Sequence, residues 1–572
     1  MSEKKKILEL RKLKKYFPVA KGVNLKAVED VSFVVYEGEK FGIVGESGCG
    51  KSTLGRTILQ LYEQTSGSCT YYGKSIQEIN PKYISANIKD LEKKQEKARE
   101  LYKKSQTIGQ KIDTLRKSLA QYDPDHSSKD AKKYDSIERE IAKLEFDSKE
   151  LKKDASRQLR EGSRTVGSLI LCRDLDKVCE LFLLAQNETQ KAHEAIEEFN
   201  KAKIKKDEVS FLIDAKRNAD REIKFLKGLK ELSEERELRL RDLLETKEKV
   251  KNLKEEDLLA QEKELEEEMN KVLAKVNEHK DKESALKQEA FDKYHGKDIL
   301  PITERALDPK YQEKLDKNYE TGINLSKLTK KELRDIRPDM QMVFQDPAAS
   351  MDPRQTIGKA IEEPFALHTN LTPAMRKEKT LSLLHDVDLK PEHYYVYPHS
   401  LSGGMKQRAG IARAIALDPS VVVLDEAVSA LDVSVQAQIL QLLEKLRKEK
   451  NLTYLFITHD LGVVKHFCDR VLVMYLGNVC ELADAKDLFK NPLHPYTSSL
   501  LAAVPHIDVE KARAETKILE GEVPSPINPP KGCPFHTRCP KCMEICKKEK
   551  PAVIEKEKGH FVACHLYDEK EG

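Results

Sequence analysis

The stretch GESGCGKST, Gly45 to Thr53, decides the fold of this chain of 572 residues. It fits the phosphate-loop pattern G-x-x-x-x-G-K-[ST], in which glycines let backbone N–H groups turn toward phosphate oxygens. In this pattern a lysine reaches the outer phosphates and a hydroxyl group holds magnesium. Gly50, Lys51 and Ser52 stand at the decisive positions. The stretch therefore predicts a loop that binds the phosphates of a nucleotide.

The segments on both sides of this loop match that interpretation. The largely apolar residues 40–44 predict a strand that leads into the loop, and residues 52–62 predict a helix that follows it. The N-terminus of such a helix carries partial positive charge, which favours a bound anion. The context therefore predicts an α/β fold with a phosphate site at the end of a strand.

Two later motifs place acidic and basic groups after further strands. VVVLDE at 421–426 is an apolar run that ends in two carboxylates, as expected of a central parallel strand. We expect Asp425 to hold magnesium and Glu426 to act as general base on a water molecule. The alternative is that both residues merely end a strand and cap the next helix. In YLFITHD, His459 follows another apolar strand, where an imidazole can hydrogen-bond a γ-phosphate.

Together these motifs resemble those of the ATP-binding subunits of ABC transporters, in the order in which that family carries them. The resemblance rests on GESGCGKST, VFQDP with Gln345, LSGG at 401–404, Asp425–Glu426, SALD at 429–432 and His459. It implies an α/β fold with an ABC-type P-loop nucleotide-binding domain, with ATP and Mg2+ as ligands. It also implies that the chain hydrolyses ATP to ADP and phosphate.

The resemblance implies a role for each matching residue. Gln345 senses magnesium and the attacking water, and Ser402, Gly403 and Gly404 contact the γ-phosphate of an ATP molecule held by a facing subunit. The residues implied to act in hydrolysis are Glu426, His459, Gln345 and Lys51, and those implied to hold magnesium are Ser52, Gln345 and Asp425. The residues implied to bind ATP are Phe17, Gly45, Glu46, Ser47, Gly48, Cys49, Gly50, Lys51, Ser52, Thr53, Gln345, Ser402, Gly403, Gly404, Asp425 and Asp432.

Two of these assignments carry a qualification. Phe17 in LKKYFP aligns with the aromatic residue that stacks on adenine in the family, with Tyr16 as its neighbour and an ordinary core position as the alternative. Asp432 is implied to cross the interface between two subunits. A single chain of this kind therefore cannot complete its own ATP site.

The flanks of the chain resemble the oligopeptide/dipeptide importer branch, particularly its second ATPase subunit. The matching segments are GESGCGKSTLGR, QMVFQDPAASMDPR, SALDVSVQAQIL, RVLVMYLGNVCEL and HPYTSSLLAAVP. This resemblance implies a second ABC ATPase subunit, two transmembrane permease subunits and an extracytoplasmic solute-binding protein as partners. Ala427 departs from the proline that the family usually has there, and Met405–Lys406 replace the more common pair after LSGG.

Two other functions remain as alternatives. One is the ATPase of a related importer for nickel or another small solute. The other is a DNA-organising or repair ATPase, since such proteins also separate the phosphate loop from LSGG with coiled coil. In that class the glutamine loop precedes the coil, whereas here Gln345 follows the charged middle of the chain. That class also gives no reason for the HPYTSSLLAAVP segment.

Composition bounds the location and the partners. The chain has 101 Lys and Arg against 97 Asp and Glu, and this balance does not predict nucleic acid as a partner. No stretch approaches the roughly 18 consecutive apolar residues that predict a membrane span. The start, MSEKKK, lacks the apolar core of a secretory signal. We therefore expect a peripheral protein on the cytoplasmic face of the cell membrane, bound there through permease subunits.

The middle of the chain differs from its flanks. Residues 81–320 hold 108 of the 198 charged side chains, and there is no proline between Pro124 and Pro301, so long helices can run without interruption. Apolar residues recur every three or four positions from Ile108 to Leu119 and from Leu265 to Val276, which is typical of a coiled coil. We expect an out-and-back helical insertion, with the apolar patch 168–185 as a packed tip. It is either a solvated decoration or a docking arm for a regulator or for the partner ATPase.

The sequence thus predicts four segments. They are a first part of the ABC ATPase domain, 1–80; a charged helical insertion, 81–322; a second part of the ATPase domain, 323–490; and a small Cys-rich C-terminal domain, 491–572. Because the two parts of the ATPase domain form one fold, both ends of the insertion are expected to lie close together.

Five of the eleven cysteines lie near the C-terminus. Without a secretion signal, they predict thiols or metal ligands more than disulfides. Cys533, Cys539, Cys546 and Cys564 resemble the signature that closes the peptide-importer ATPases, where it is associated with an iron–sulfur cluster. Four thiolates also suit Zn2+, and a metal-free set of buried thiols is the third possibility. We expect a [4Fe–4S] cluster, with Cys542 as an additional thiol.

Overall fold

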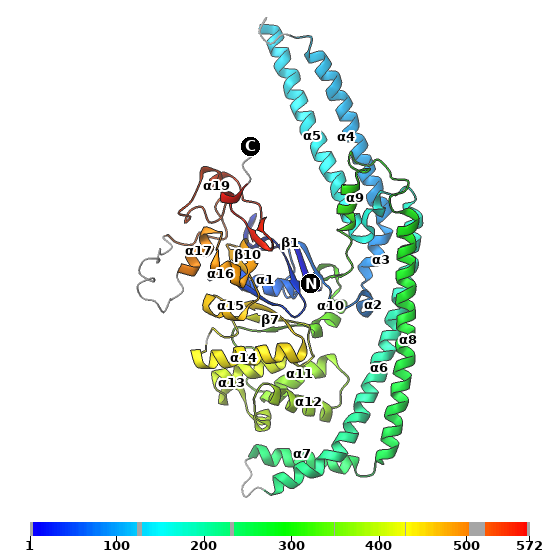
Figure 1. Ribbon diagram of the computed structural model, residues 1–572, viewed down its shortest axis with the longest axis vertical. Coiled ribbons are helices and arrows are strands. Elements are labelled where there is room, and N and C mark those ends of the chain that lie inside the picture. The colour runs from blue at the N-terminus through cyan, green and yellow to red at the C-terminus, as the bar shows by residue number, and fades with distance from the viewer. Residues whose placement is uncertain are drawn as a thin grey trace. The chain divides into compact units, whose positions relative to one another are not determined.

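The structure is a computed structural model that forms two compact units (Figure 1). Unit 1 consists of Met1–Lys74, Lys201–Glu267 and Asn324–Gly572, and unit 2 of Ser75–Asn200 and Glu268–Ile323. Unit 1 thus combines both flanks of the chain with a part of the charged middle. The structure describes residues 4–122, 128–228, 234–347, 349–429, 431–502 and 521–568.

An eight-stranded sheet forms the centre of unit 1, in the order β11-β12-β10-β9-β3-β8-β7-β6. Strands β9, β3, β8, β7 and β6 are parallel, and β10, β12 and β11 continue the sheet in antiparallel pairs. The strands are β3 Lys40–Val44, β6 Met340–Val343, β7 Val421–Asp425, β8 Thr453–Ile457, β9 Arg470–Tyr475, β10 Asn478–Asp484, β11 Ile554–Glu557 and β12 His560–Val562.

The pattern of apolar residues explains this sheet. Every residue of β7 and β8 is buried, as expected of parallel strands that are covered on both faces. Because β3, β8 and β7 are parallel neighbours, their carboxyl ends meet at one edge of the sheet. The phosphate loop, His459 and Glu426 follow these three strands, so the topology alone brings them to one edge.

A second sheet of four strands has the order β2-β1-β4-β5. Strand β1 pairs in antiparallel fashion with both β2 and β4. Its inner face is apolar and fully or almost fully buried at Leu8, Leu10 and Leu13. The strands are β1 Lys6–Ala20, β2 Val23–Tyr36, β4 Ser66–Tyr71 and β5 Ile323–Asn324.

Eleven described helices lie wholly within unit 1, and several of them begin at a side-chain cap. Ser402 and Asp432 each accept a hydrogen bond from the backbone N–H three residues later, and so begin α13 and α14. The helices are α1 Lys51–Ile58, α7 Glu234–Val250, α10 Lys330–Ile336, α11 Ile357–His368, α12 Pro373–Asp386, α13 Gly403–Ile415, α14 Val433–Lys450, α15 Leu461–Phe467, α16 Ala485–Lys490, α17 Pro495–Ala502 and α19 Glu544–Lys548, with short 3-10 turns at η2 Leu325–Lys327, η3 Arg337–Asp339, η4 Pro391–Tyr395, η5 Pro398–Ser400 and η6 His565–Tyr567.

The helix after the phosphate loop is shorter than the sequence predicts. It was expected over 52–62 but ends at Ile58. Gln60 has a φ of 53°, in the left-handed region, and this conformation stops a helix. The N–H groups of Leu61 and Tyr62 both bond back to the carbonyl of Arg56.

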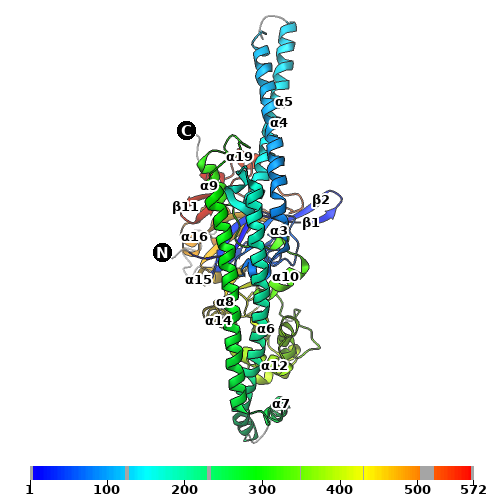
Figure 2. The ribbon, with the colours of Figure 1, turned by 90° about the vertical axis from the view of Figure 1, so that its right-hand side faces the viewer.

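Unit 2 is helical. Helices α4 and α5 lie side by side, and α6 and α8 form a second adjacent pair whose ends belong to unit 1 (Figure 2). Leu265, Val272 and Val276, from the stripe predicted in the sequence, are buried against residues of α6. The helices are α2 Ile76–Ile79, α3 Lys82–Lys89, α4 Leu91–Leu119, α5 Ser128–Val166, α6 Leu175–Lys227, α8 Glu255–Tyr294 and α9 Pro309–Asp316, with a 3-10 turn at η1 Gly167–Leu171.

The apolar patch 168–185 is not a tip. Leu169, Leu171 and Val178 are buried in the main core of unit 2, among residues of α3, α4, α5 and α8. The patch has few charged residues among its apolar ones, and so large an apolar surface is unfavourable in water. Several helices therefore cover it. Among the residues that the structure describes, no helix is long and apolar enough to cross a membrane.

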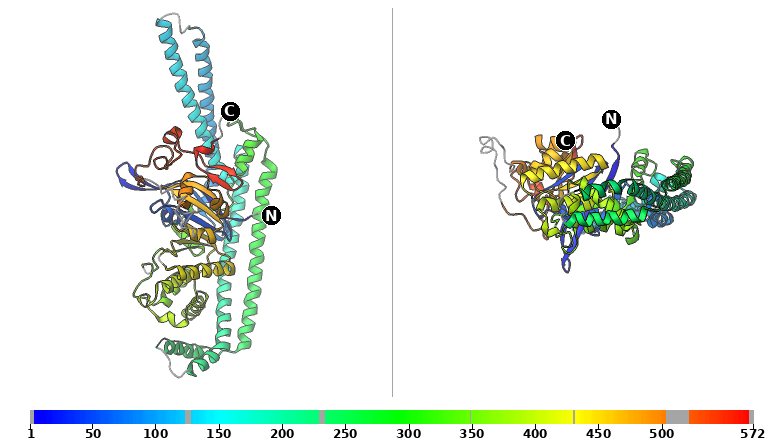
Figure 3. Two further views of the ribbon diagram at one scale, coloured as in Figure 1. Left: turned by 60° about the vertical axis from the view of Figure 1, so that its left-hand side comes forward. Right: turned by 90° about the horizontal axis from the view of Figure 1, so that it is seen from below.

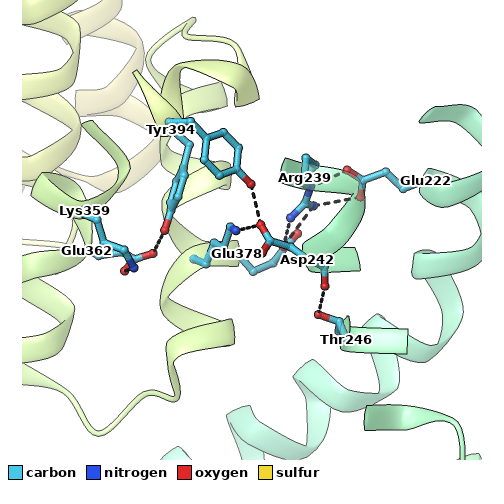
Figure 4. A network of polar contacts seen from close by, with 10 residues as sticks. Glu222, Arg239, Asp242, Thr246, Lys359, Glu362, Glu378 and Tyr394 are labelled. Atoms are coloured by element: carbon cyan, nitrogen blue, oxygen red, sulfur yellow. Dashed lines mark hydrogen bonds and ion pairs between the residues drawn. The ribbon is translucent and has the colours of Figure 1, made fainter. Parts of the chain in front are cut away.

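Helix α7, drawn in teal at the bottom of the left view of Figure 3, contacts other helices of unit 1 through a network of ion pairs and hydrogen bonds (Figure 4). Arg239, whose side chain is 12% exposed, bonds to both carboxylate oxygens of Glu222 on α6 and lies 3.4 Å from Glu378 on α12. Asp242 accepts hydrogen bonds from Tyr395 of η4 and pairs with Lys377 of α12. This part of the charged middle therefore rests on helices of its own chain.

The network predicts that Asp242→Ala loosens α7. Its removal leaves Lys377 and the hydroxyl of Tyr395 without this acceptor, and for such half-exposed groups the loss is about 1 kcal/mol. Amide hydrogen exchange of α7 is expected to become on the order of fivefold faster, while Glu237→Ala, an exposed position on the same helix, leaves it unchanged. Equal exchange in the two variants would contradict the contact.

Candidate nucleotide site

The phosphate loop joins β3 to α1 and needs glycine at its first and sixth positions. Gly45 has a φ of 152° and Gly50 a φ of 99°. A Cβ atom at Gly50 would lie 2.1 Å from the carbonyl oxygen of Ala27, and one at Gly45 would lie 2.2 Å from that of Met474. Neither neighbour is a flexible side-chain end. Both glycines are therefore required by close approach of the backbone.

Lys51 is the first residue of α1, and its side chain folds back over the loop. Its ammonium group donates to the carbonyl oxygens of Gly45 at 2.8 Å and Glu46 at 3.1 Å. Lys51 is 5% exposed. The loop therefore holds a buried ammonium group against two of its own backbone carbonyls.

A cavity of about 510 Å³ opens above this loop. It brings together residues that the sequence predicts from four separate motifs: the loop itself, the glutamine after β6, the residue after β7 and the residue after β8. The residues that line it are Leu25, Lys26, Ala27, Ser47, Gly48, Gly50, Lys51, Ser52, Thr53, Gln345, Glu426, His459, Leu476, Gly477 and Pro526.

Ser52 and Asp425 meet at the floor of the site. The hydroxyl of Ser52 donates to Oδ1 of Asp425 at 2.6 Å, and Asp425 is fully buried. Its Oδ2 accepts no hydrogen bond, and the nearest cation is Nη2 of Arg56 at 3.7 Å. Burial raises the pKa of Asp425, while the bond from Ser52 opposes this. A buried acceptor without a donor is costly, and hydroxyl and carboxylate oxygens suit Mg2+, so this pair fits a magnesium ion.

Glu426 lies between two polar side chains from neighbouring segments. Its Oε2 accepts from Nε2 of Gln345 at 2.8 Å, and its Oε1 is 3.4 Å from Nδ1 of His459. Its backbone has a φ of 49°, which is uncommon for a residue other than glycine, and its N–H donates to Ile457 at 2.9 Å. Such a conformation is maintained by its surroundings and is frequent at functional sites. Ala427, after it, is buried.

The signature residues lie away from this cavity. Ser402 is exposed at the start of α13, and Gly403 and Gly404 open the first turn of that helix. Asp432 caps α14 and bonds to Ser434 at 2.6 Å. None of these residues is among those that line the cavity. Ala430, within the SALD motif, lies outside the described residues.

Phe17 is half-buried on β1 and is also absent from the cavity lining. Its ring packs edge-on against Tyr62, with centroids 5.4 Å apart. Tyr16 bonds through its hydroxyl to Glu29 at 2.5 Å. The stacking of either residue on adenine stays a prediction. Instead, Leu25 and Pro526 border the cavity on this side.

Two further residues that the sequence analysis did not single out contact the phosphate loop. Tyr496, at the start of α17, accepts the backbone N–H of Glu46 through its hydroxyl at 2.9 Å. Arg538, in the C-terminal region, forms an ion pair with the Glu46 side chain. In the sequence, Tyr496 lies in HPYT and Arg538 lies between Cys533 and Cys539. Neither position indicates which residue the side chain contacts.

The four C-terminal cysteines gather in one neighbourhood. Burial raises the pKa of Cys533 to about 11, and the thiols of Cys546, Cys564 and Cys539 add to this rise. Across the described ranges of the chain, however, no three His, Cys, Asp or Glu side chains have the arrangement of metal ligands. Cys542 is half-buried like Cys533 and Cys539, whereas Cys546 and Cys564 are buried, so burial does not single out Cys542 among the five.

Comparisons with known proteins agree with this geometry. A family model described as ABC transporter matches residues 28–296 and 311–429. The chain therefore belongs to the ABC transporter family and is an ATPase of that family. A second model, described as the C-terminal region of oligopeptide/dipeptide transporters, matches residues 480–546.

Individual relatives are similar to less than half of the chain. It is 53% identical over 251 residues to the oligopeptide transport ATP-binding protein AppF of Bacillus subtilis, a match that covers 43% of this chain and 75% of that protein. It is 49% identical over 245 residues to the oligopeptide transport ATP-binding protein OppF of Haemophilus influenzae, covering 42% and 74% respectively.

The loop geometry predicts different effects of alanine at two neighbouring glycines. Gly50→Ala places a Cβ against the backbone of Ala27, whereas Gly48→Ala meets nothing within 4 Å although its φ, 77°, is also positive. We expect Gly50→Ala to weaken Mg-ATP binding by at least about tenfold more than Gly48→Ala, measured by calorimetry on the purified chain. Similar affinities in both variants would show that the close approach has no role.

Proposed function

We propose that this chain is the ATP-hydrolysing subunit that powers an ABC importer for oligopeptides or dipeptides. One observation carries the proposal: a single cavity is lined by Lys51, Ser52, Gln345, Glu426 and His459, which come from four separate segments. The peptide cargo rests on the printed names of AppF and OppF and on the match of the C-terminal region.

The mechanism follows from these positions. Lys51 and His459 stabilise the negative charge that develops on the γ-phosphate, and the loop N–H groups bind the phosphate oxygens. Glu426 polarises the attacking water, and the amide of Gln345, 2.8 Å from its carboxylate, fixes its direction. Ser52 and Asp425 hold magnesium, which when bound neutralises charge on the phosphates. Catalysis is therefore mostly positioning and electrostatics.

A second ATPase subunit completes the site. Ser402, Gly403, Gly404 and Asp432 lie outside this chain's own cavity, and Ser402 and Asp432 are exposed. This supports their contact with ATP held by a facing subunit, in a heterodimer. ATP closes the two subunits, and hydrolysis lets them separate. The remaining partners are an extracytoplasmic solute-binding protein and two permease subunits. The permease subunits place the chain at the cytoplasmic face of the membrane.

The same proposal includes the organisation of the chain. The ATPase domain consists of 1–80 and 323–490, the stretch 81–322 is a coiled-coil insertion, and 491–572 is a Cys-rich C-terminal domain. The long α4, α5, α6 and α8 and their buried apolar stripes support the insertion. Phe17 is proposed as the residue that stacks on adenine.

Cys533, Cys539, Cys546 and Cys564 are proposed to bind a [4Fe–4S] cluster, with Zn2+ as the alternative. Support comes from the mutual effect of their thiols on one another's pKa and from the match of the C-terminal family model. A cluster would need these four thiols to turn toward one common centre, two of them from half-buried and two from buried positions.

Glu426→Gln tests the catalytic assignment. The amide keeps the size of the side chain but cannot act as a base, so the variant should bind Mg-ATP and form a stable dimer while hydrolysis falls by at least about a hundredfold. ATP turnover and size-exclusion chromatography with the partner subunit measure this. Glu449→Gln, exposed on α14, is the matched control and keeps full activity. Full turnover by Glu426→Gln would refute the proposed role.

Absorption and elemental analysis of anaerobically purified protein test which metal the four cysteines bind. A cluster gives a broad absorption near 400 nm that Cys546→Ser abolishes and Cys542→Ser retains. Zinc gives no such absorption but one metal ion per chain by elemental analysis. A wild-type chain with neither signal would remove the metal from the proposal.

A further inference from the structure

We propose that Arg538 is a positioning residue for the phosphate loop, so that nucleotide binding depends on the fold of the cysteine segment 533–546. The inference rests on the ATP site proposed above and adds a regulatory input to it. It concerns residues that lie 492 positions apart in the chain, Glu46 and Arg538.

The contact is a bidentate ion pair. Nη1 of Arg538 is 2.8 Å from Oε2 of Glu46, and Nη2 is 3.1 Å from Oε1. The Arg538 side chain is 6% exposed and that of Glu46 is 24% exposed. Two parallel N–H···O bonds fix orientation as well as charge, which one lysine cannot do. Since Glu46 is the second residue of the phosphate loop, the pair ties the cysteine segment to that loop.

Glu46 is held from the backbone side as well. Its N–H donates to the hydroxyl of Tyr496, which is fully buried. Its carbonyl oxygen accepts from the ammonium group of Lys51 at 3.1 Å and from the N–H of Cys49 at 3.2 Å. A shift of Glu46 would therefore move the lysine that is proposed to meet the γ-phosphate.

Packed aromatic rings hold the other end of the contact. Tyr475, Tyr496 and Phe535 form a triangle with ring centroids 4.8 to 5.3 Å apart, and none of them is more than 1% exposed. The N–H of Arg538 donates to the carbonyl of Phe535 at 3.0 Å. Such rings pack in defined orientations, so they set the position of the cysteine segment beneath the loop.

The cysteines lie directly beside these anchors. Cys533 precedes Phe535 by two residues, and Cys539 follows Arg538. A shift in the backbone of this segment would therefore reach Glu46 through Arg538, and Lys51 through Glu46. By linkage, nucleotide at the loop must stabilise the cysteine segment to the same extent.

A second buried ion pair provides a matched control. Arg470 on β9 lies 3.1 Å from Glu39, with side chains 12% and 5% exposed, and neither residue lines the cavity. If Arg538 acted only as a general stabilising residue, Arg470→Gln and Arg538→Gln would have equivalent effects. A positioning role makes them differ in nucleotide affinity.

The first experiment compares Mg-ATP affinity and thermal stability in the full-length chain. We expect Arg538→Gln to raise Kd about tenfold, equivalent to about 1.4 kcal/mol, with Arg538→Lys in between and Glu46→Gln similar to Arg538→Gln. The double variant Glu46→Gln with Arg538→Gln should bind Mg-ATP no more weakly than either single variant. Arg470→Gln lowers the melting temperature and leaves Kd unchanged.

The second experiment follows amide hydrogen exchange of residues 533–546. Mg-ATP should slow this exchange in the wild-type chain and have no effect in Arg538→Gln. Kd values within twofold of wild type for Arg538→Gln, Arg538→Lys and Glu46→Gln, together with equal protection, would overturn the inference. A wild-type chain that does not bind Mg-ATP would instead overturn the proposed function.

Discussion

The hydrogen bond between Ser52 and Asp425 joins two segments that are 373 positions apart, and the rest of the site depends on it. It ties the start of α1 to the end of β7 at the edge to which the parallel sheet brings both, and there the phosphate loop faces the residues after the neighbouring strands. Only a parallel sheet brings these strand ends to one edge. The long charged middle of the chain must therefore leave and return without disturbing β3 and β7.

Such a site contains polar groups that are already buried without a bound ligand. Asp425 keeps one carboxylate oxygen without a hydrogen bond, and the ammonium group of Lys51 rests on backbone carbonyls. Glu426 sits in a left-handed backbone conformation. The unpaired oxygen and the left-handed backbone are each unfavourable by themselves, and a divalent cation bound beside Ser52 would supply the partner that Asp425 lacks. This is why the fold and the ATP chemistry cannot be separated.

Contacts from outside the nucleotide motifs hold two regions of unit 1. The first region is the phosphate loop, where Tyr496 and Arg538 bind Glu46 from the C-terminal region. The second is α7, which contacts α12 and η4 through charged side chains. These contacts differ in kind. The first combines a largely buried ion pair with packed aromatic rings, whereas the second includes ion pairs with exposed carboxylates. Salt should therefore screen the contacts of α7 more strongly than the contact between Arg538 and Glu46.

The sequence by itself determined the strand, loop and helix around Lys51 and the acidic end of β7, because these depend on local spacing and on uninterrupted apolar runs. It did not determine where α1 ends, because the left-handed conformation of Gln60 leaves no mark in the pattern of apolar residues. It also did not determine that the patch 168–185 lies in a core. Only the tertiary structure decided which distant side chains meet, such as Glu46 with Arg538. The reason is that an ion pair leaves no periodic trace in a sequence, whereas a buried strand does.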